Sequence, residues 1–102
     1  MPTIAQLDSL LARAPGDAFL LYALAMEHAK QGRHGEAVGL FRRAIVADSA
    51  NPYHHYHGAL SLEAIDDRRG AIAMVREGIE AAKASGDEKA RAELGALLDM
   101  WE

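Results

Sequence analysis

The chain has 102 residues, half of them hydrophobic and a quarter charged, so it can form one small globular domain with a modest core. Its formal net charge of -4 argues against DNA or RNA as the main partner, because nucleic-acid binding needs a basic face. The lack of cysteine excludes disulfide scaffolds, thiolate zinc sites and cysteine catalysis.

The sequence contains no predicted targeting or membrane segment. The N-terminal stretch MPTIAQLDSL has no basic segment followed by an apolar run, so no signal peptide is expected. No apolar stretch approaches the roughly 20 residues that a membrane-spanning helix requires. We therefore expect a cytoplasmic protein without a membrane partner.

Apolar residues recur at helical spacing along the whole chain, and no segment alternates apolar and polar residues over the length of a strand. Turn-forming residues interrupt the helical pattern at Pro15-Gly16, Gly32, Asp66-Asp67 and Ser85-Gly86. Six helices are predicted, over residues 4–14, 18–31, 36–47, 52–65, 69–84 and 87–101. Short helices with short connections favour antiparallel neighbours, so the expected fold class is all-α, built from helix-turn-helix units.

Four of the predicted helix starts carry capping residues, among them Asp87, which follows the Ser85-Gly86 turn and precedes the last helix. Thr3 and Gln6 have the spacing of a capping box. Asp17 is suited to cap the second helix. Asn51 is suited to cap the fourth, with Pro52 at the first helical position, where its missing N–H costs nothing.

The helices repeat when the sequence is shifted by about 34 residues. The matched pairs are Tyr22 with Tyr56, Ala25 with Ala59, Ala37 with Ala71, Arg42 with Arg76, and Ile45 with Ile79. The sequence thereby resembles the tetratricopeptide-repeat (TPR) family, whose repeats are pairs of antiparallel helices with small residues where the two helices cross. In the first repeat Phe41 stands at the family's large aromatic position and Gly32 at its turn.

The resemblance implies two full repeats, at residues 18–51 and 52–85. Residues 3–15 would form the second half of an incomplete repeat closed by Pro15, and residues 87–101 a capping helix. The sequence departs from the family pattern at the Trp position of the first helix, which holds Leu21 and His55. It also has Ser49 where a Pro often closes a repeat.

In TPR folds the first helices of successive repeats line a concave groove, so the resemblance implies a non-catalytic protein-interaction module. The residues at groove positions, and hence the predicted partner-binding residues, are Phe19, Tyr22, Met26, Lys30, Tyr53, Tyr56, Leu60, Glu63 and Lys89. All three tyrosines of the chain are among them. Aromatic side chains offer a large contact area at a small loss of entropy, which suits a binding surface.

The predicted groove also indicates what kind of protein or peptide it would bind. Chaperone-binding TPR domains grip a C-terminal carboxylate with Lys, Arg and Asn, whereas the corresponding positions here are Tyr22, Met26, Tyr56 and Leu60. An apolar or aromatic peptide, or an amphipathic helix, is therefore the expected partner. The alternative is that two repeats curl too tightly to form a groove and that the tyrosines pack on one another.

The stretch NPYHHYHGAL raises the question of a metal site. His54 and His57 share one helical face, but a metal site needs three or four ligands and the sequence fixes no third one. We predict no metal ligand, with His54 and His57 partly exposed and His55 filling the space between helices through a hydrogen bond. A histidine-based metal binder is kept as the least favoured functional alternative.

The sequence contains no recognisable catalytic motif. No Gly-rich loop follows a strand, and the segment from Gly32 to Gly39 lacks the Lys-Ser/Thr of a phosphate-binding loop. We predict that the protein is not an enzyme and binds no cofactor.

The C-terminal helix suggests a second functional alternative. Leu94 and Leu98 are predicted to point where a further helix would pack, and leaving such a side chain in water forgoes about 1.5–3 kcal/mol. A second copy of the chain could cover this face. The alternative function is therefore a self-assembling scaffold subunit that forms a homodimer through one chain end.

Overall fold

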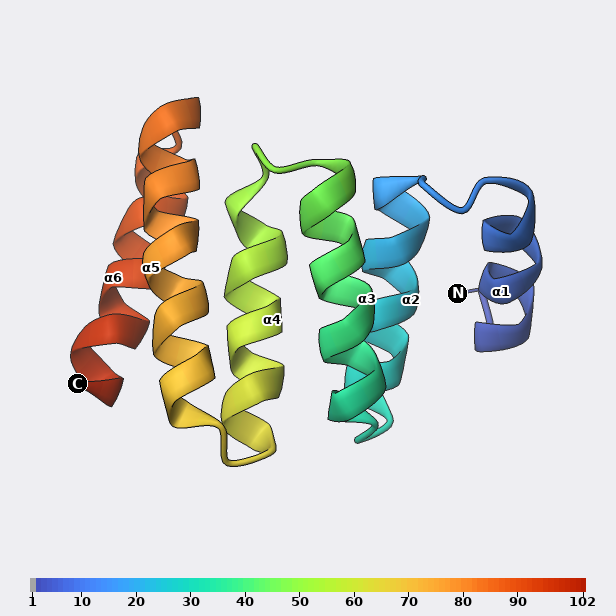
Figure 1. Cartoon of the computed structure of the whole chain (residues 1–102), viewed down its shortest axis with the longest axis horizontal. Coiled ribbons are helices and arrows are strands. Elements are labelled where there is room, and N and C mark those ends of the chain that lie inside the picture. The colour runs from blue at the N-terminus through green and yellow to red at the C-terminus, as the bar shows by residue number, and fades with distance from the viewer. Residues whose placement is uncertain (1) are drawn as a thin grey trace.

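The structure, a computed structural model, describes residues 2–102 and consists of α-helices joined by short turns (Figure 1). The helices are α1 (Ile4–Arg13), α2 (Ala18–Lys30), α3 (His34–Ala47), α4 (Pro52–Ala64), α5 (Arg68–Ser85) and α6 (Glu88–Trp101). Residues 2–102 contain no strand, which confirms the predicted all-α fold class. None of the helices in this part of the chain is both long and apolar enough to cross a membrane.

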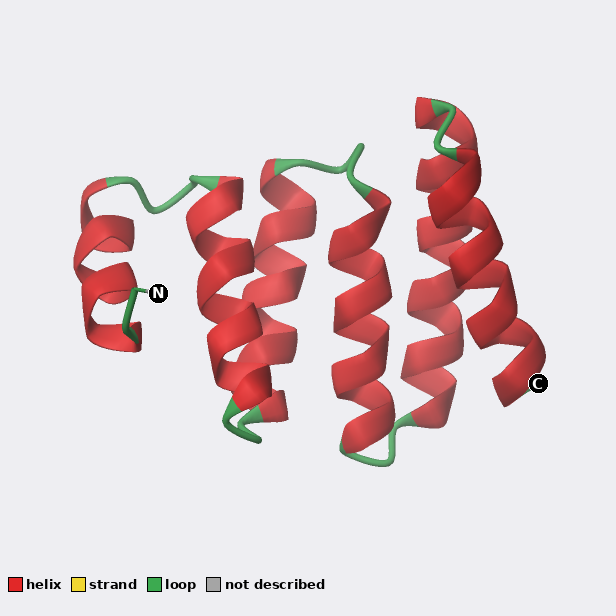
Figure 2. Cartoon of the chain, turned by 180° about the vertical axis from the view of Figure 1, so that it is seen from behind, coloured by secondary structure: helices red, strands yellow, loops and turns green. Residues whose placement is uncertain are grey.

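The helices form antiparallel hairpins that stand side by side in one row (Figure 1). α2 packs against α3, α4 packs against α5, and α3 packs against α4 to join the two hairpins. α1 covers α2 at one end of the row, and α6 covers α5 at the other. Seen from behind, α2 and α6 lie in front of α3 and α5, so the row has two layers (Figure 2).

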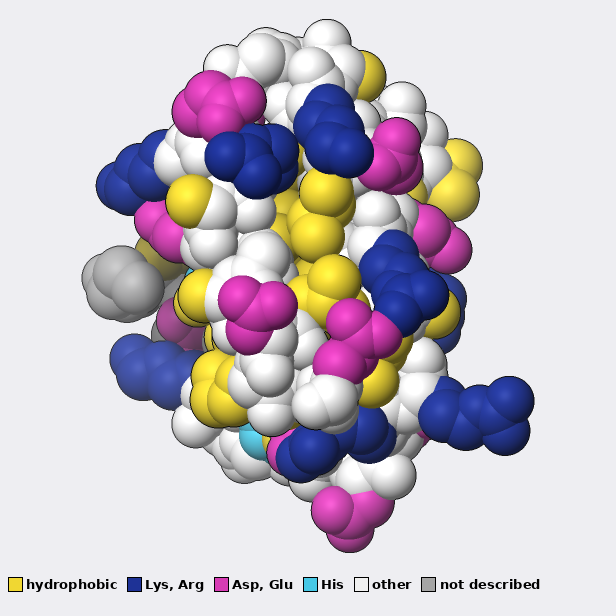
Figure 3. Space-filling view, turned by 90° about the vertical axis from the view of Figure 1, so that its left-hand side faces the viewer, with side chains coloured by type: hydrophobic (Ala, Val, Ile, Leu, Met, Phe, Trp, Pro, Cys, Tyr) yellow, Lys and Arg dark blue, Asp and Glu magenta, His cyan; other side chains and the backbone are white. Residues whose placement is uncertain are grey.

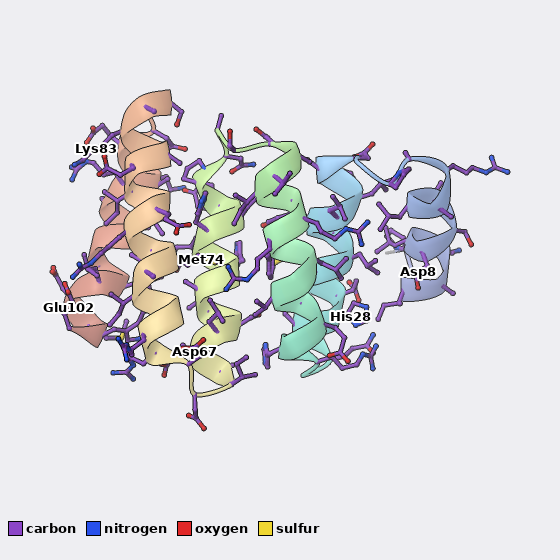
Figure 4. All side chains as sticks on the ribbon, in the orientation of Figure 1. Asp8, His28, Asp67, Met74, Lys83 and Glu102 are labelled. Carbon is purple, nitrogen blue, oxygen red and sulfur yellow. The ribbon has the colours of Figure 1, made fainter. Side chains whose placement is uncertain are left out.

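Five of the six helices begin at a residue whose side chain accepts a hydrogen bond from the backbone of the first turn. These residues are Thr3, Asp17, Asn51, Asp67 (labelled in Figure 4) and Asp87. Such a cap typically contributes about 1 kcal/mol, and the capping predicted for Thr3, Asp17, Asn51 and Asp87 is confirmed. α3 is the exception: Arg33 precedes it without a capping bond, and the helix begins at His34, before the predicted Glu36.

The two hairpin turns lie in the same register and use the left-handed backbone conformation. Gly32, between α2 and α3, has a φ of 81°, which glycine adopts without steric cost. Asp66, one repeat period later between α4 and α5, has a φ of 63°. A residue with a Cβ pays a steric penalty there, so the second turn is less favourable than the first.

Two glycines allow close approach between neighbouring helices. A Cβ on Gly78 would lie 2.6 Å from the Cβ of His55, so α5 and α4 touch almost backbone to backbone at this point. A Cβ on Gly58 would lie 2.6 Å from the sulfur of Met74 (labelled in Figure 4) and 3.3 Å from the Cβ of Phe41. Close packing of this kind makes the core sensitive to a single added methyl group.

The prediction for Leu94 was wrong, because this side chain is fully buried against α5 instead of facing outward. α5 is 18 residues long whereas α3 has 14, so Asp87 lies beyond the position that the 34-residue shift predicts. Leu94 therefore occupies the place in α6 that Gly58 occupies in α4, on the side of the preceding helix. Leu98 is only partly buried, as the sequence indicated.

Candidate partner-binding groove

The face formed by α2, α4 and α6 is the inner side of the row. Cα atoms of α4 lie within 8 Å of both α2 and α6, whereas no Cα atom of His34–Ala47 lies within 8 Å of one in Arg68–Ser85. When the helices of a row lie closer together on one face than on the other, the row curves and the closer face becomes the inner one. The positions predicted for partner binding lie on α2, α4 and α6, the helices of this inner layer.

A continuous line of rings crosses this face. The Tyr22 ring from α2 lies 6.1 Å from Phe41 of α3, edge to face, and 5.7 Å from His57 of α4. His57 in turn lies 5.1 Å from Tyr56, and Tyr56 lies 6.1 Å from Tyr53. Edge-on pairs at these separations are favourable by about 0.5–1.5 kcal/mol beyond their buried area, so the rings hold one another in place.

The tyrosines are neither fully buried nor fully exposed. Tyr22, Tyr53 and Tyr56 are all half-buried, with one side packed on neighbouring rings and the other side open. Phe19 and Leu60 stand further out, with 75% and 38% of their surfaces exposed. The tyrosines thus pack on neighbouring rings, which is part of the alternative interpretation. On the solvent side of the line, Phe19 and Leu60 still expose apolar groups.

Two pockets lie between α2 and α4 on either side of this line. One, of about 460 Å³, lies at the capped starts of the two helices, and we call it the cap pocket; Ala18, Phe19, Tyr22, Asp48, Asn51, Tyr53 and His54 line it. The other, of about 440 Å³, lies toward the opposite ends of the helices, and we call it the turn pocket; Met26, Glu27, Ala29, Lys30, His34, Phe41, His57, Leu60 and Ser61 line it. Six of the predicted partner-binding residues therefore line one pocket or the other.

Three of the predicted residues line neither pocket. Tyr56 lies between them, through its contacts with Tyr53 and His57. Glu63 forms an ion pair with Arg68, with 2.9 Å between Oε2 and Nε, and this pairing lowers the pKa of the carboxyl. Lys89 is exposed on α6 and lies 4.0 Å from Glu93.

The histidines of α4 were predicted only in part. His54 was expected to be partly exposed and is 3% exposed, because it lies on the face of α4 that packs against α2 and α3. His55 is buried as expected, but its Nδ1 and both ring nitrogens of His54 have no hydrogen-bond partner among residues 2–102. The repeat register contained the missing information, since His54 and His55 fall on the apolar Leu20 and Leu21 of the first repeat.

Burial governs the ionisation of these groups. It lowers the pKa of His54, His55 and His57, since a charged imidazolium would lose its hydration, and Asp48 only partly offsets the effect at His54. Burial also raises the pKa of Tyr22. The pKa of Tyr53 is raised by burial first and then by the Glu93 and Asp87 carboxylates.

Two further arrangements bear on chemistry. Among residues 2–102, no three side chains of the His, Cys, Asp or Glu types are grouped closely enough to hold a metal ion. His34 Nδ1 lies 3.2 Å from the Oγ of Ser61, but Ser61 is 2% exposed, so this pair joins α3 to α4 and its hydroxyl is out of reach of a substrate.

Known structures resemble this chain over most of its length. A crystal structure of a tetratricopeptide repeat domain protein from Salinibacter ruber is 32% identical, with a TM-score of 0.76, and the alignment covers 83% of this chain and 94% of that one. A solution NMR structure of a tetratricopeptide repeat domain protein from the same organism is 33% identical, with a TM-score of 0.79 and coverages of 86% and 89%. No family model matches the sequence, and no curated protein matches it.

Proposed function

Because the chain belongs to the tetratricopeptide-repeat family, we propose that it is a non-catalytic interaction module that binds a peptide or a partner helix along α2, α4 and α6. Helical repeat modules of this kind generally take part in protein interactions through their surfaces. In the proposed division, α2 with α3 and α4 with α5 are the two repeats, α1 is a half-repeat and α6 is the cap.

The observation that carries the proposal is the combination of exposed apolar side chains and pockets along one line. Phe19 projects from α2 beside the cap pocket, and Leu60 projects from α4 beside the turn pocket. An exposed apolar strip favours a partner, since covering it removes apolar surface from water at about 25 cal/mol per Å². The tyrosine hydroxyls along the same line can hydrogen-bond to a bound backbone.

The groove favours an apolar or aromatic segment over an acidic C-terminal tail. The four central positions hold Tyr22, Met26, Tyr56 and Leu60, which provide no positive charge. Lys30 lies at the edge of the turn pocket, where Glu27 also lies. A partner would therefore gain mainly from ring and methyl contacts, as an amphipathic helix in a groove does.

The proposal is tested with exposed residues, so that loss of binding is separated from loss of folding. Phe19→Ala and Leu60→Ala are compared with Val46→Ala, which removes an equally apolar side chain that is 87% exposed and lines a different pocket. Native partners are captured with each tagged full-length variant and quantified by mass spectrometry. We expect the groove variants to retain at least tenfold less partner than the wild type and Val46→Ala to retain all of it, with unchanged circular dichroism. Equal retention by all three variants would contradict the proposal.

A second candidate function rests on the α6 end of the row. Viewed from that end, apolar side chains run in a strip between charged ones (Figure 3). Leu98 and Trp101 of α6 are only partly buried, and Met100 is exposed. If this face joins two copies, Leu98→Glu changes the mass measured by light scattering and leaves partner capture unchanged. A wild-type protein that stays at the mass of one chain at high concentration removes this candidate.

A further inference from the structure

We propose that the cap pocket binds a basic side chain, Arg or Lys, of the partner segment, an inference that rests on the proposed groove function. The pocket combines three aromatic rings, one carboxylate and a buried, unpartnered imidazole. Its volume of about 460 Å³ is in the range of small-ligand sites, about 300–1,000 Å³.

Aromatic rings from two helices border the cap pocket. Phe19 and Tyr22 come from α2, and Tyr53 comes from α4 on the other side. Phe19 is mostly exposed, so its ring is free to close over a bound group. A cation over an aromatic face gains about 0.5–1 kcal/mol when exposed and about 2 kcal/mol when desolvated, and Arg or Lys also packs its aliphatic stem on the rings.

The imidazole of His54 gives an independent reason to expect a ligand with hydrogen-bond donors. His54 lines the pocket, is 97% removed from solvent, and has no partner for either ring nitrogen among residues 2–102. A neutral imidazole has one acceptor nitrogen, and leaving it unpaired in the interior is unfavourable. Both ring nitrogens are buried beneath the pocket surface, so a guanidinium, with five N–H donors, or an ammonium, with three, would reach this acceptor once the imidazole turns toward the pocket.

The charges around the pocket favour a cation over an anion. Asp48 lines the pocket, and no Lys or Arg is among its described lining residues. The N-terminus of a helix attracts anions because its first backbone N–H groups lack partners. In α2 and α4 the side chains of Asp17 and Asn51 already accept hydrogen bonds from first-turn N–H groups, which leaves fewer donors for an anion. Asp87 and Glu93 add negative charge near Tyr53, and the whole chain carries a formal charge of -4.

The two pockets together describe the partner more closely than either alone. The turn pocket presents Met26 and Leu60 to a bound segment, which suits an apolar side chain. The expected partner is therefore a segment that carries a basic residue at one end and an apolar residue at the other.

The ligand class is tested on the full chain with small probes that differ only in side-chain charge. Nα-acetyl amides of arginine, lysine, glutamine and glutamate are titrated into the isotopically labelled protein and followed by two-dimensional NMR. We expect the arginine or lysine probe to shift the amide signals of Phe19, Tyr22, Tyr53 and His54, with a dissociation constant at least tenfold below that of the glutamine probe. Tighter binding of the glutamate probe, equal binding of all four, or shifts confined to other residues would each overturn the assignment.

Two variants locate the charge and the rings. Asp48→Asn keeps an oxygen that can accept the 3.3 Å bond from the amide of Ala50, and it is expected to weaken binding of the basic probe about five- to tenfold. Asp66→Asn, the same change in the turn at the far end of α4, is the matched control and leaves binding unchanged. Phe19→Leu keeps an apolar residue and removes the ring, with an expected weakening of about threefold.

The outcome for the cation site is separable from the outcome for the groove. If captured partner is lost with Leu60→Ala and retained with Asp48→Asn, the groove function stands and the basic side chain is refuted. Loss with both variants, together with probe binding that needs Asp48, supports both proposals. Retention with both variants contradicts the groove and the assignment that rests on it.

Discussion

The hairpins α2–α3 and α4–α5 follow the same path and fill it with different side chains. Where the first hairpin buries Leu21 and Leu24, the second has His55 and Gly58 at the same register positions. Phe41 fills the space between helices in the first, and the smaller Val75 does so in the second. The same helix-pair geometry is thus filled by large apolar side chains in the first hairpin and by a closer approach around glycine in the second. The second arrangement places imidazoles in the interior.

The largest expected effect comes from the side chain on which the first hairpin depends. Phe41→Ala removes a fully buried ring that also supports Tyr22 and His57, and it is expected to lower the free energy of unfolding by about 3–5 kcal/mol. The same truncation at Val75 removes fewer atoms and is expected to cost less. Chemical denaturation of both variants measures the difference. An equal loss at the two positions would contradict the view that the first hairpin relies on bulk and the second on close approach.

The second expected effect comes from the close approach itself. Gly78→Ala copies the first hairpin, which has Ala44 at this register, but the added methyl would lie 2.6 Å from the Cβ of His55. Overpacking typically costs about 1–3 kcal/mol, while the gain in helix propensity over glycine is about 1 kcal/mol. We expect a net loss of up to about 2 kcal/mol in urea denaturation. Gly95→Ala, where an added Cβ meets no atom within 4 Å, is the control and should be stabilising.

The buried imidazoles make the second hairpin sensitive to acid. Because burial lowers the folded-state pKa of His54, His55 and His57, the unfolded state binds more protons once the pH falls below the ordinary value of 6.5. Their contribution to stability is therefore full above pH 6.5 and is lost as the pH falls through the lowered values. Asp48, Glu77 and Glu93 oppose the shift at these histidines, and burial is the largest cause at each.

Urea denaturation at about pH 7.5 and about pH 5 measures this loss, in a range where ordinary carboxyl groups stay ionised. His55→Leu copies Leu21 of the first hairpin, removes one of the three groups and should reduce the difference between the two midpoints. A midpoint that does not move with pH would show that these rings are protonated equally in the folded and unfolded states.

The sequence alone predicted the helices because their determinants are local. Caps at Thr3, Asp17 and Asn51 mark helix starts through one side chain and one turn of backbone. The 34-residue register placed Tyr22 and Tyr56 on neighbouring helices of one face. The start of α3 was missed because Arg33 makes no capping bond, so nothing local marks it.

The features that could not be predicted depend on contacts between helices. Leu94 was misplaced although the start of its helix was predicted, because only the packed structure shows which face of α6 lies against α5. The repeat register already placed His54 on the apolar Leu20, but the cap pocket around it requires the distance between α2 and α4, which helical periodicity does not contain. The periodicity of a single helix does not predict the burial of polar residues, and in this chain such residues lie in the candidate site.

The smallest expected effect concerns the hairpin turns, where the two halves can be made alike. Asp66→Gly gives the second turn the residue that the first turn has, in a left-handed conformation with a φ of 63°. Glycine removes the steric penalty of about 1–2 kcal/mol but adds freedom to the unfolded chain, so a net gain of about 0.5–1 kcal/mol is expected. Gly32→Ala, at a φ of 81°, is the reciprocal change and should destabilise the protein.

Because both turns lie on the surface away from the cap pocket, thermal denaturation should shift in opposite directions for the two variants while partner capture stays constant. A loss of stability in Asp66→Gly would mean that the carboxylate contributes more to the turn than its backbone conformation costs.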